Sequence, residues 1–232
     1  VSVTRKEKHN VKVVIISEKS EYNHLLDEVE SFKPVVIGFS SVSSQFNYVK
    51  GMAALIKELF PSITIICGGV HPTINADALL EAENINGFFV GESELSIIEF
   101  LNKIEKGESF KETDNFAYVQ DGKVVRNKLK NLLEDLDLLP HPDKEIYPYK
   151  KTIMDLGYAP FFFARGCPYM CTYCSNHALA KLYGRKRNYP RFRSPEVCIR
   201  EIEEVMEKYG KLIEFVWILD DIFGLNNKWR EE

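Results

Sequence analysis

The sequence predicts an α/β protein with two successive domains, a doubly wound parallel sheet followed by the start of a parallel β/α barrel. In residues 11–110, short apolar runs rich in β-branched residues alternate with amphipathic stretches, and a second such alternation occupies residues 159–219. Strands that are apolar throughout are buried on both faces, so their alternation with helices indicates parallel sheets covered on both sides. A chain of 232 residues is long enough for two small domains.

The first domain is expected over residues 1–110. Strands are predicted at Val11–Ser17, Val35–Ser40, Ile63–Cys67 and Gly87–Val90. Helices are predicted at Glu21–Phe32, Phe46–Phe60, Ala76–Glu83 and Glu94–Ile104. In such sheets a ligand lies outside the carboxyl ends of the strands. The residues at those ends are Ser40, Ser41, Gly68, Gly69, Gly91 and Glu92.

Residues 111–150 are expected to form a hairpin and a connector. Two β-branched runs flank Asp121-Gly122, which is a strong signal for a two-residue hairpin turn. The segment Leu132–Asp143 is punctuated by prolines, and we place the border between the domains there.

The second domain is expected over residues 151–232. A strand is predicted at Ala159–Ala164, and Ser194-Pro195 starts a helix in the favoured cap-then-proline order. Gly210 ends this helix, and the strand Leu212–Leu219 runs into Asp220-Asp221. Cys198 lies on the apolar face of the helix, and Cys67 lies on an apolar strand, so both are interpreted as core residues rather than ligands.

Three other cysteines, Cys167, Cys171 and Cys174, follow the first strand of the second domain. Thiolates three and four positions apart can converge on one small inorganic centre. A 4Fe-4S cluster normally takes four cysteine ligands, so three leave one iron open to a substrate. Zinc is the alternative, with His177 completing a Cys3His set, although zinc sites usually pair a short CxxC with a second, distant pair. Five cysteines without a signal peptide argue against disulfides.

Composition narrows the functional classes. The net charge of −4 and the pI near 5.8 give no general attraction to nucleic acid or to anionic membranes. No apolar run approaches the roughly 20 residues that span a bilayer. We therefore expect a cytoplasmic protein.

The spacing C-x3-C-x-aromatic-C, with Tyr173 in the aromatic place, resembles the cluster loop of the radical S-adenosylmethionine (SAM) enzymes. Further segments are similar to signatures of the cobalamin-binding radical SAM proteins, which carry a Rossmann-like corrinoid-binding domain before the barrel. These segments are Lys33–Ser40, Cys67–Thr73, Val90–Glu94, Asp135–Asp137, Phe192–Pro195 and Leu219–Phe223. Each is weak by itself, but together and in this order they are specific.

The resemblance implies three cofactors: a 4Fe-4S cluster, SAM and cobalamin. It implies that Cys167, Cys171 and Cys174 ligate three irons, that Tyr173 lies near the adenine, and that Asp220 and Asp221 contact the amino group of SAM. It also implies a cobalamin site at the strand ends of the first domain, formed by Ser40, Ser41, Gly68, Gly69, Gly91 and Glu92.

Two details concern cobalamin itself. Glycines such as Gly68 and Gly69 let the backbone approach a bulky flat ligand without Cβ collisions. His71 follows them and is a candidate at the corrin edge, but the Asp-x-His-x-x-Gly motif that supplies a histidine to cobalt does not occur. We therefore expect cobalamin with no protein histidine below cobalt.

Three functions remain open. The first is an enzyme that transfers a methyl group to an unactivated carbon or phosphorus, or carries out a radical rearrangement or cyclisation, on a small-molecule substrate with a reductant such as flavodoxin or ferredoxin. The second is an RNA-modifying radical SAM methylthiotransferase, because aromatics are interleaved with basic residues. These basic residues are Lys181, Arg185, Lys186, Arg187, Arg191 and Arg193. The third is a non-catalytic corrinoid-binding module.

The length also carries an expectation. Only 58 residues (232 minus 174) follow Cys174, enough for about two of the six β/α units usual in the barrel. Val1 takes the place of an initiator Met, and Val1–Asn10 resembles the tail of the family's first helix. We expect a piece of a longer protein that lacks the first strand of one domain and most of the other.

Overall fold

A computed structural model describes residues 1–185 and 190–231. The chain divides into two compact units, which are described separately. One comprises Val14–Leu132 with Leu182–Gly184, and the other comprises Val1–Val13, Leu133–Lys181 and Arg185–Glu232. Among the described residues, no helix has the length and apolar character needed to cross a membrane.

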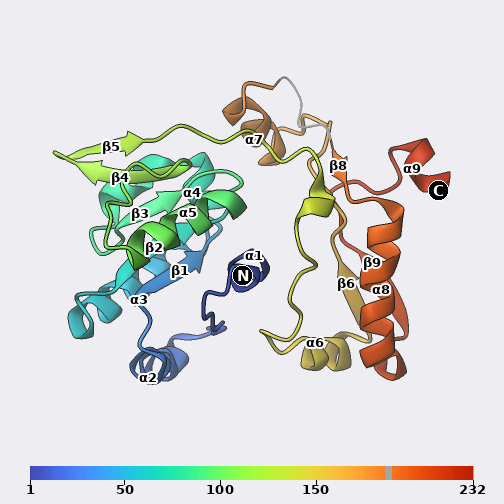
Figure 1. Cartoon of the computed structure of the whole chain (residues 1–232), viewed down its shortest axis with the longest axis horizontal. Coiled ribbons are helices and arrows are strands. Elements are labelled where there is room, and N and C mark those ends of the chain that lie inside the picture. Colours follow the sequence, from blue (N-terminus) through green and yellow to red (C-terminus); the bar gives the residue numbers. More distant parts are fainter. Residues whose placement is uncertain (186–189, 232) are drawn as a thin grey trace. The chain divides into compact units, whose positions relative to one another are not determined.

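A five-stranded sheet forms the centre of the first unit (Figure 1). Its strands, in both sequence and spatial order, are β1 (Val36–Ser40), β2 (Thr64–Gly68), β3 (Gly87–Phe89), β4 (Phe116–Gln120) and β5 (Lys123–Arg126). The first three are parallel, and β4 and β5 are antiparallel. Asp121 and Gly122 join β4 to β5 with φ of 51° and 71°. Positive φ at both central residues is what a type I′ turn needs, so the predicted hairpin is confirmed.

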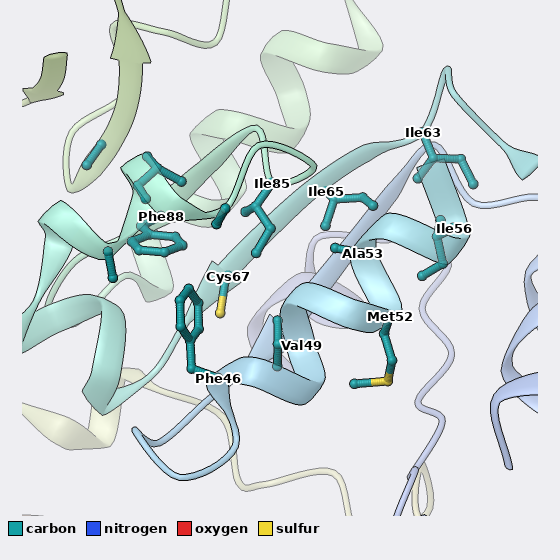
Figure 2. Packing of buried hydrophobic residues seen from close by; sticks show 14 of the residues in the cluster. Phe46, Val49, Met52, Ala53, Ile56, Ile63, Ile65, Cys67, Ile85 and Phe88 are labelled. Atoms are coloured by element: carbon teal, nitrogen blue, oxygen red, sulfur yellow. The ribbon is translucent and has the colours of Figure 1, made fainter. Parts of the chain in front are cut away.

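Helices cover both faces of this sheet. The helices α2 (Tyr22–Phe32) and α3 (Phe46–Leu59) share one apolar cluster with Ile65 and Cys67 of β2. Figure 2 shows the α3 side of this cluster, from Phe46 to Ile56. The helix α5 (Glu94–Glu105) packs on the other face, in a cluster that contains Ile66. Successive residues of β2 therefore point to opposite, equally apolar faces, as expected for a central strand of a covered parallel sheet. The α/β fold predicted from the sequence is confirmed.

Two elements of the first unit differ from the predictions. Val11–Ser17 is not a strand: Val14 and Ile16 pack against the first cluster while Ile15 is exposed. Its alternation supplies an apolar face, but a strand also needs a partner for its backbone N–H and C=O groups, and no described strand pairs with it. The predicted helix Ala76–Glu83 is instead a 3-10 helix, η2 (Ala76–Glu81), after the short helix α4 (Val70–Ile74).

The second unit contains the predicted strand–helix–strand repeat. Strand β6 (Tyr158–Phe161) pairs in parallel with β9 (Phe215–Ile218), and α8 (Pro195–Tyr209) connects them. The Ser194 side chain accepts a hydrogen bond from the Val197 N–H at 3.3 Å and caps α8. The remaining elements are α1 (Ser2–Lys6), η3 (Leu136–Leu138), α6 (Tyr149–Leu156), β7 (Ala164–Arg165), α7 (Asn176–Leu182), β8 (Arg191–Phe192), η4 (Gly210–Leu212) and α9 (Asn227–Glu231).

Candidate functional site

The residues predicted to bind a ligand in the first unit lie together at the carboxyl ends of β1, β2 and β3. Ser40 is the register partner of Gly68. The Ser41 N–H donates to the Gly68 carbonyl at 3.0 Å, and the Ser41 carbonyl accepts from the His71 N–H at 3.1 Å. These backbone bonds join the loops after β1 and β2 into one edge, with the Ser40 side chain exposed and Ser41 buried.

Glycine occupies the two adjacent positions 68 and 69 of this edge for different structural reasons. Gly69 has a φ of +101°, and a Cβ there would lie 2.8 Å from both the N and O atoms of Ser41. Its own chain therefore requires glycine. At Gly68 a Cβ would meet only Phe89, at 3.9 Å, which is ordinary contact. The contacts around position 68 do not require glycine, and glycine leaves room there for the close approach of a ligand.

The loop after β3 is fixed by a buried asparagine that sequence reasoning missed. The side-chain amide of Asn115 donates to the carbonyls of Val90 and Glu92, at 2.9 and 3.2 Å, on either side of Gly91. Asn115 itself has a φ of 62°, which asparagine tolerates better than most residues. The Gly91 N–H donates to the Thr73 hydroxyl at 3.0 Å, which ties this loop to the one after β2. Nothing in the sequence around Asn115 distinguishes it from a turn residue.

Tyr183 also belongs to this edge, and its presence changes the interpretation of Gly91. The Tyr183 hydroxyl accepts from the Glu92 N–H at 2.8 Å. A Cβ on Gly91 would lie 2.1 Å from the same hydroxyl oxygen, and Gly91 has a φ of +76°. Glycine at position 91 is thus explained by the backbone and by Tyr183, without a ligand.

His71 is a buried packing residue in this structure. Its ring lies 4.4 Å from the Phe46 ring centroid, and its Nδ1 is 2.9 Å from the Ser43 hydroxyl. Its Nε2 is buried and has no hydrogen-bond partner among the described residues. Burial, assisted by the charge of Lys50, lowers the pKa of His71. In this structure the His71 ring therefore acts as a packing residue beneath the sheet edge.

The three-cysteine segment forms an irregular loop between β7 and α7. Gly166, with φ of 97°, starts the loop, and Cys174 N–H donates to the Cys171 carbonyl at 3.1 Å. Cys171 is exposed, Cys167 and Cys174 are half-buried, and none of the three is in a disulfide. Tyr173 is almost fully exposed, and the Cys171 thiol beside it raises the pKa of the Tyr173 hydroxyl.

The three thiols of this loop are better suited to bind a metal cluster than the thiols of Cys67 and Cys198. Burial raises the pKa of Cys67 and of Cys198 to about 12 in each case, so neither readily supplies the thiolate that binds a metal. In the described residues, no three His, Cys, Asp or Glu side chains are gathered closely enough to hold a metal. The three loop thiols are therefore accessible donors on one segment that still has to close around a cluster.

The two acidic residues after β9 have different surroundings. Asp220 Oδ1 accepts the N–H groups of Phe163 and Ala164, at 2.7 and 2.9 Å, and its Oδ2 is buried with no partner in the described structure. Burial raises the pKa of Asp220, although the two N–H groups oppose this shift. Asp221 is exposed, and its Oδ2 accepts the side-chain amide of Asn176 at 3.0 Å. Asp220 holds the backbone that leads into the cluster loop, whereas Asp221 keeps one oxygen available.

The basic segment after the cluster loop does not form an open cationic surface in the described residues. Arg191 and Arg193 are buried, and both guanidinium groups donate to backbone carbonyls of residues 133–140. Arg185 pairs with Glu134 of the same connector. Lys181 is exposed, and Lys186 and Arg187 lie outside the described residues. Three of the six basic residues, Arg185, Arg191 and Arg193, therefore hold the connector in place.

Comparisons with known proteins agree with this arrangement. Residues 3–101 match the B12 binding domain family. An uncharacterized methyltransferase of Pyrococcus horikoshii is 27% identical over 227 residues, covering 96% of this chain and 48% of the relative. Residues 3–101 therefore form a B12-binding domain, and the chain as a whole is similar to cobalamin-dependent radical SAM proteins.

Further proteins are similar to this chain over shorter parts of their length. The anaerobic magnesium-protoporphyrin IX monomethyl ester cyclase of Rubrivivax gelatinosus is 28% identical over 191 residues, covering 79% of this chain and 33% of the cyclase. The chain thus spans about half or less of the length of these two relatives. A solved radical SAM methyltransferase, TsrM from Kitasatospora setae with cobalamin and a [4Fe-4S] cluster bound, shares the fold. Its TM-score is 0.70 at 14% identity, and the match covers 98% of this chain and 45% of that one.

Proposed function

We propose that this chain binds cobalamin at the carboxyl edge of β1, β2 and β3, and a 4Fe-4S cluster with SAM at the Cys167–Cys174 loop. The whole protein would then be a cobalamin-dependent radical SAM enzyme, a methyltransferase or a radical cyclase acting on a small molecule. The observation that carries this proposal is the loop itself, in which three accessible thiols lie on one irregular segment while both other cysteines are buried.

The residues of the chain have distinct tasks in this proposal. Cys167, Cys171 and Cys174 would hold three irons of the cluster. When bound, the cluster would supply the electron for the reductive cleavage of SAM, and a reductant such as flavodoxin or ferredoxin would supply that electron to the cluster. Asp221, with one free carboxylate oxygen, is the better candidate for the SAM amino group, because both oxygens of Asp220 are buried or engaged.

Cobalamin would carry the methyl group in the methyltransferase version. The exposed Ser40 and the unhindered Gly68 are the residues of the edge whose side-chain space a ligand can enter. Ser41, Gly69, Gly91 and Glu92 support this edge through backbone contacts. His71 supports it by packing, so cobalt would have no protein histidine below it. The relatives include both methyltransferases and a cyclase, so methyl transfer and ring formation both remain candidates.

Anaerobic reconstitution tests the cluster. The chain should take up about four irons and four sulfides, and alanine at Cys167, Cys171 or Cys174 should abolish the uptake. Cys67→Ala and Cys198→Ala are matched controls that should retain it, because those thiols are buried elsewhere. Tight binding of zinc without iron would overturn the proposal. Cobalamin binding is measured separately by the visible absorbance retained after gel filtration.

A further inference from the structure

A buried asparagine connects the third cysteine of the loop to the end of β9. Asn176 is only 7% exposed and lies two residues after Cys174. Its side-chain nitrogen donates to the Cys174 sulfur at 3.5 Å and to Asp221 Oδ2 at 3.0 Å. One primary amide therefore bridges a thiol of the loop and a carboxylate.

The carboxylate determines which way the amide points. An Asn side chain has two N–H donors and one carbonyl acceptor, and a carboxylate can only accept. Bonding to Asp221 therefore places the NH2 group, not the carbonyl oxygen, toward the loop, and its second N–H faces Cys174. Asp221 follows Asp220, whose two bonds to the Phe163 and Ala164 N–H groups fix the end of β9 beside the start of the loop. The Asn176 amide is thus oriented by Asp221, and Asp221 in turn follows a residue that is bonded to the start of the loop.

An N–H donor on a cluster thiolate has a defined electrostatic effect. Reduction adds one negative charge to the cluster and its ligands, and a donor to sulfur stabilises that charge, so hydrogen bonds to the sulfurs help to set the reduction potential. Such outer contacts also orient the ligand they touch. The donation to a neutral thiol in the described structure becomes stronger when the sulfur carries the charge of a bound thiolate.

We propose that Asn176, oriented by Asp221, is a positioning residue that donates to the Cys174 ligand and raises the potential of the one-electron couple of the cluster. This rests on the proposed function, because it assumes that the loop holds a cluster. It adds an asymmetry among the three ligands, because the amide beside Cys174 is buried, whereas Tyr173 beside Cys171 is exposed. The effect is on the ease of reduction and does not require Asn176 to touch SAM or substrate.

The test uses the whole chain with a reconstituted cluster, titrated with reductant and followed by electron paramagnetic resonance. Asn176→Leu has similar volume and no donor. We expect this variant to keep about four irons. At a given potential its ratio of reduced to oxidised cluster should fall about tenfold, which corresponds to a midpoint potential about 59 mV more negative for one electron. Asn176→Gln, which retains the amide, should move the potential back toward that of the original chain.

Ser175→Ala is the matched control. Ser175 is adjacent to Cys174, and its side chain makes no hydrogen bond to described residues, so the potential should not change. An unchanged potential in Asn176→Leu with four irons bound would overturn this inference and leave the proposed function standing. Failure of the original chain to bind iron would instead overturn the proposed function.

A second measurement does not depend on any variant folding. In chain labelled with ¹⁵N only in its asparagine side chains, pulsed electron paramagnetic resonance of the reduced cluster should detect a weak ¹⁵N coupling transmitted through the bond to Cys174. Absence of this coupling from a fully reduced four-iron cluster would overturn the inference even if Asn176→Leu were unstable.

Discussion

At the scale of single residues, buried polar atoms separate positions that look equivalent in the sequence. Asp220 and Asp221 are adjacent acids after one strand, and the sequence assigned them the same task. The structure gives Asp220 a backbone-holding task through two N–H groups and leaves Asp221 exposed. No local signal distinguishes them, because the difference arises from residues 163 and 164, far away in the chain.

Asp220 therefore has a stability prediction. Asp220→Ala should lower the free energy of unfolding by about 1–3 kcal/mol, because it leaves two N–H groups without their acceptor. Asp220→Asn keeps an acceptor oxygen and should cost less. Chemical denaturation measures both variants. An unchanged stability in Asp220→Ala with loss of SAM binding would show that Asp220 contacts the cofactor instead.

The pH dependence of stability follows from the same carboxyl. Burial raises the pKa of Asp220 in the folded state. The contribution of Asp220 to the free energy of unfolding is therefore fully present below the ordinary pKa of Asp. It is lost as the pH rises through the raised pKa of the folded state. The difference in unfolding free energy between the original chain and Asp220→Asn should thus change in favour of the Asn variant as pH rises through that window. A difference that stays constant with pH would contradict the raised pKa.

His71 supplies the second prediction at this scale. His71→Ala removes a ring that packs on Phe46 and bonds to Ser43, so the free energy of unfolding should fall by about 0.5–3 kcal/mol. The electron paramagnetic resonance spectrum of bound cob(II)alamin should be the same in both proteins. Loss of a nitrogen coupling to cobalt on removing His71 would show that His71 is a ligand.

At the scale of elements, the sequence predicts best where local chemistry alone decides the structure. Asp-Gly specifies the β4–β5 turn, and Ser194-Pro195 specifies the start of α8; both are found as expected. Val11–Ser17 fails because a strand is defined by a partner, which a single segment cannot reveal. The buried Arg191 and Arg193 likewise looked like a basic surface, since a sequence does not show that connector carbonyls lie beside them.

The residues of the candidate site likewise fall into those that local sequence predicts and those that only the structure reveals. The spacing of Cys167, Cys171 and Cys174 predicts a cluster loop, and the apolar strands predict the edge at which the candidate ligand residues lie together. Asn115 and Asn176 could not be found, because each acts through contacts with segments distant in sequence. An isolated asparagine is more often a turn residue, so only three-dimensional proximity identifies these two.

The paired glycines give a prediction at the level of the β2–α4 turn. Gly69→Ala should reduce stability by about 1–3 kcal/mol, since φ is +101° and its Cβ would contact the Ser41 backbone at 2.8 Å. Gly68→Val should fold normally but bind cobalamin more weakly by at least tenfold. Thermal unfolding and retained absorbance measure the two effects.

The matched control for this pair is Gly51→Val on α3, where an added Cβ meets nothing within 4 Å. This variant should alter neither cobalamin binding nor the fold. Unchanged cobalamin affinity in a folded Gly68→Val chain would remove Gly68 from the proposed site.

At the scale of the whole molecule, the second unit exposes aromatic surface on one face of the β6–β9 pair. Phe215 and Trp217 are 52% and 47% exposed, while Val216 and Ile218, which alternate with them, pack against the core under α8. Tyr158 lies 5.2 Å from the Phe215 ring and 4.8 Å from the Trp217 ring, so the three form one aromatic group. Contiguous exposed apolar groups of this kind favour association.

This surface gives the last prediction. The 232-residue chain should bind a hydrophobic dye and self-associate. The double substitution Phe215→Ser and Trp217→Ser should reduce both dye binding and self-association. It should not change the iron content, because the cysteine loop is a separate segment. Leu138→Ser is the matched control: Leu138 is 64% exposed but belongs to the separate turn η3, so its loss should have little effect. Dye fluorescence and analytical ultracentrifugation measure the outcome. A monomeric chain without dye binding would show that this aromatic face is covered in solution.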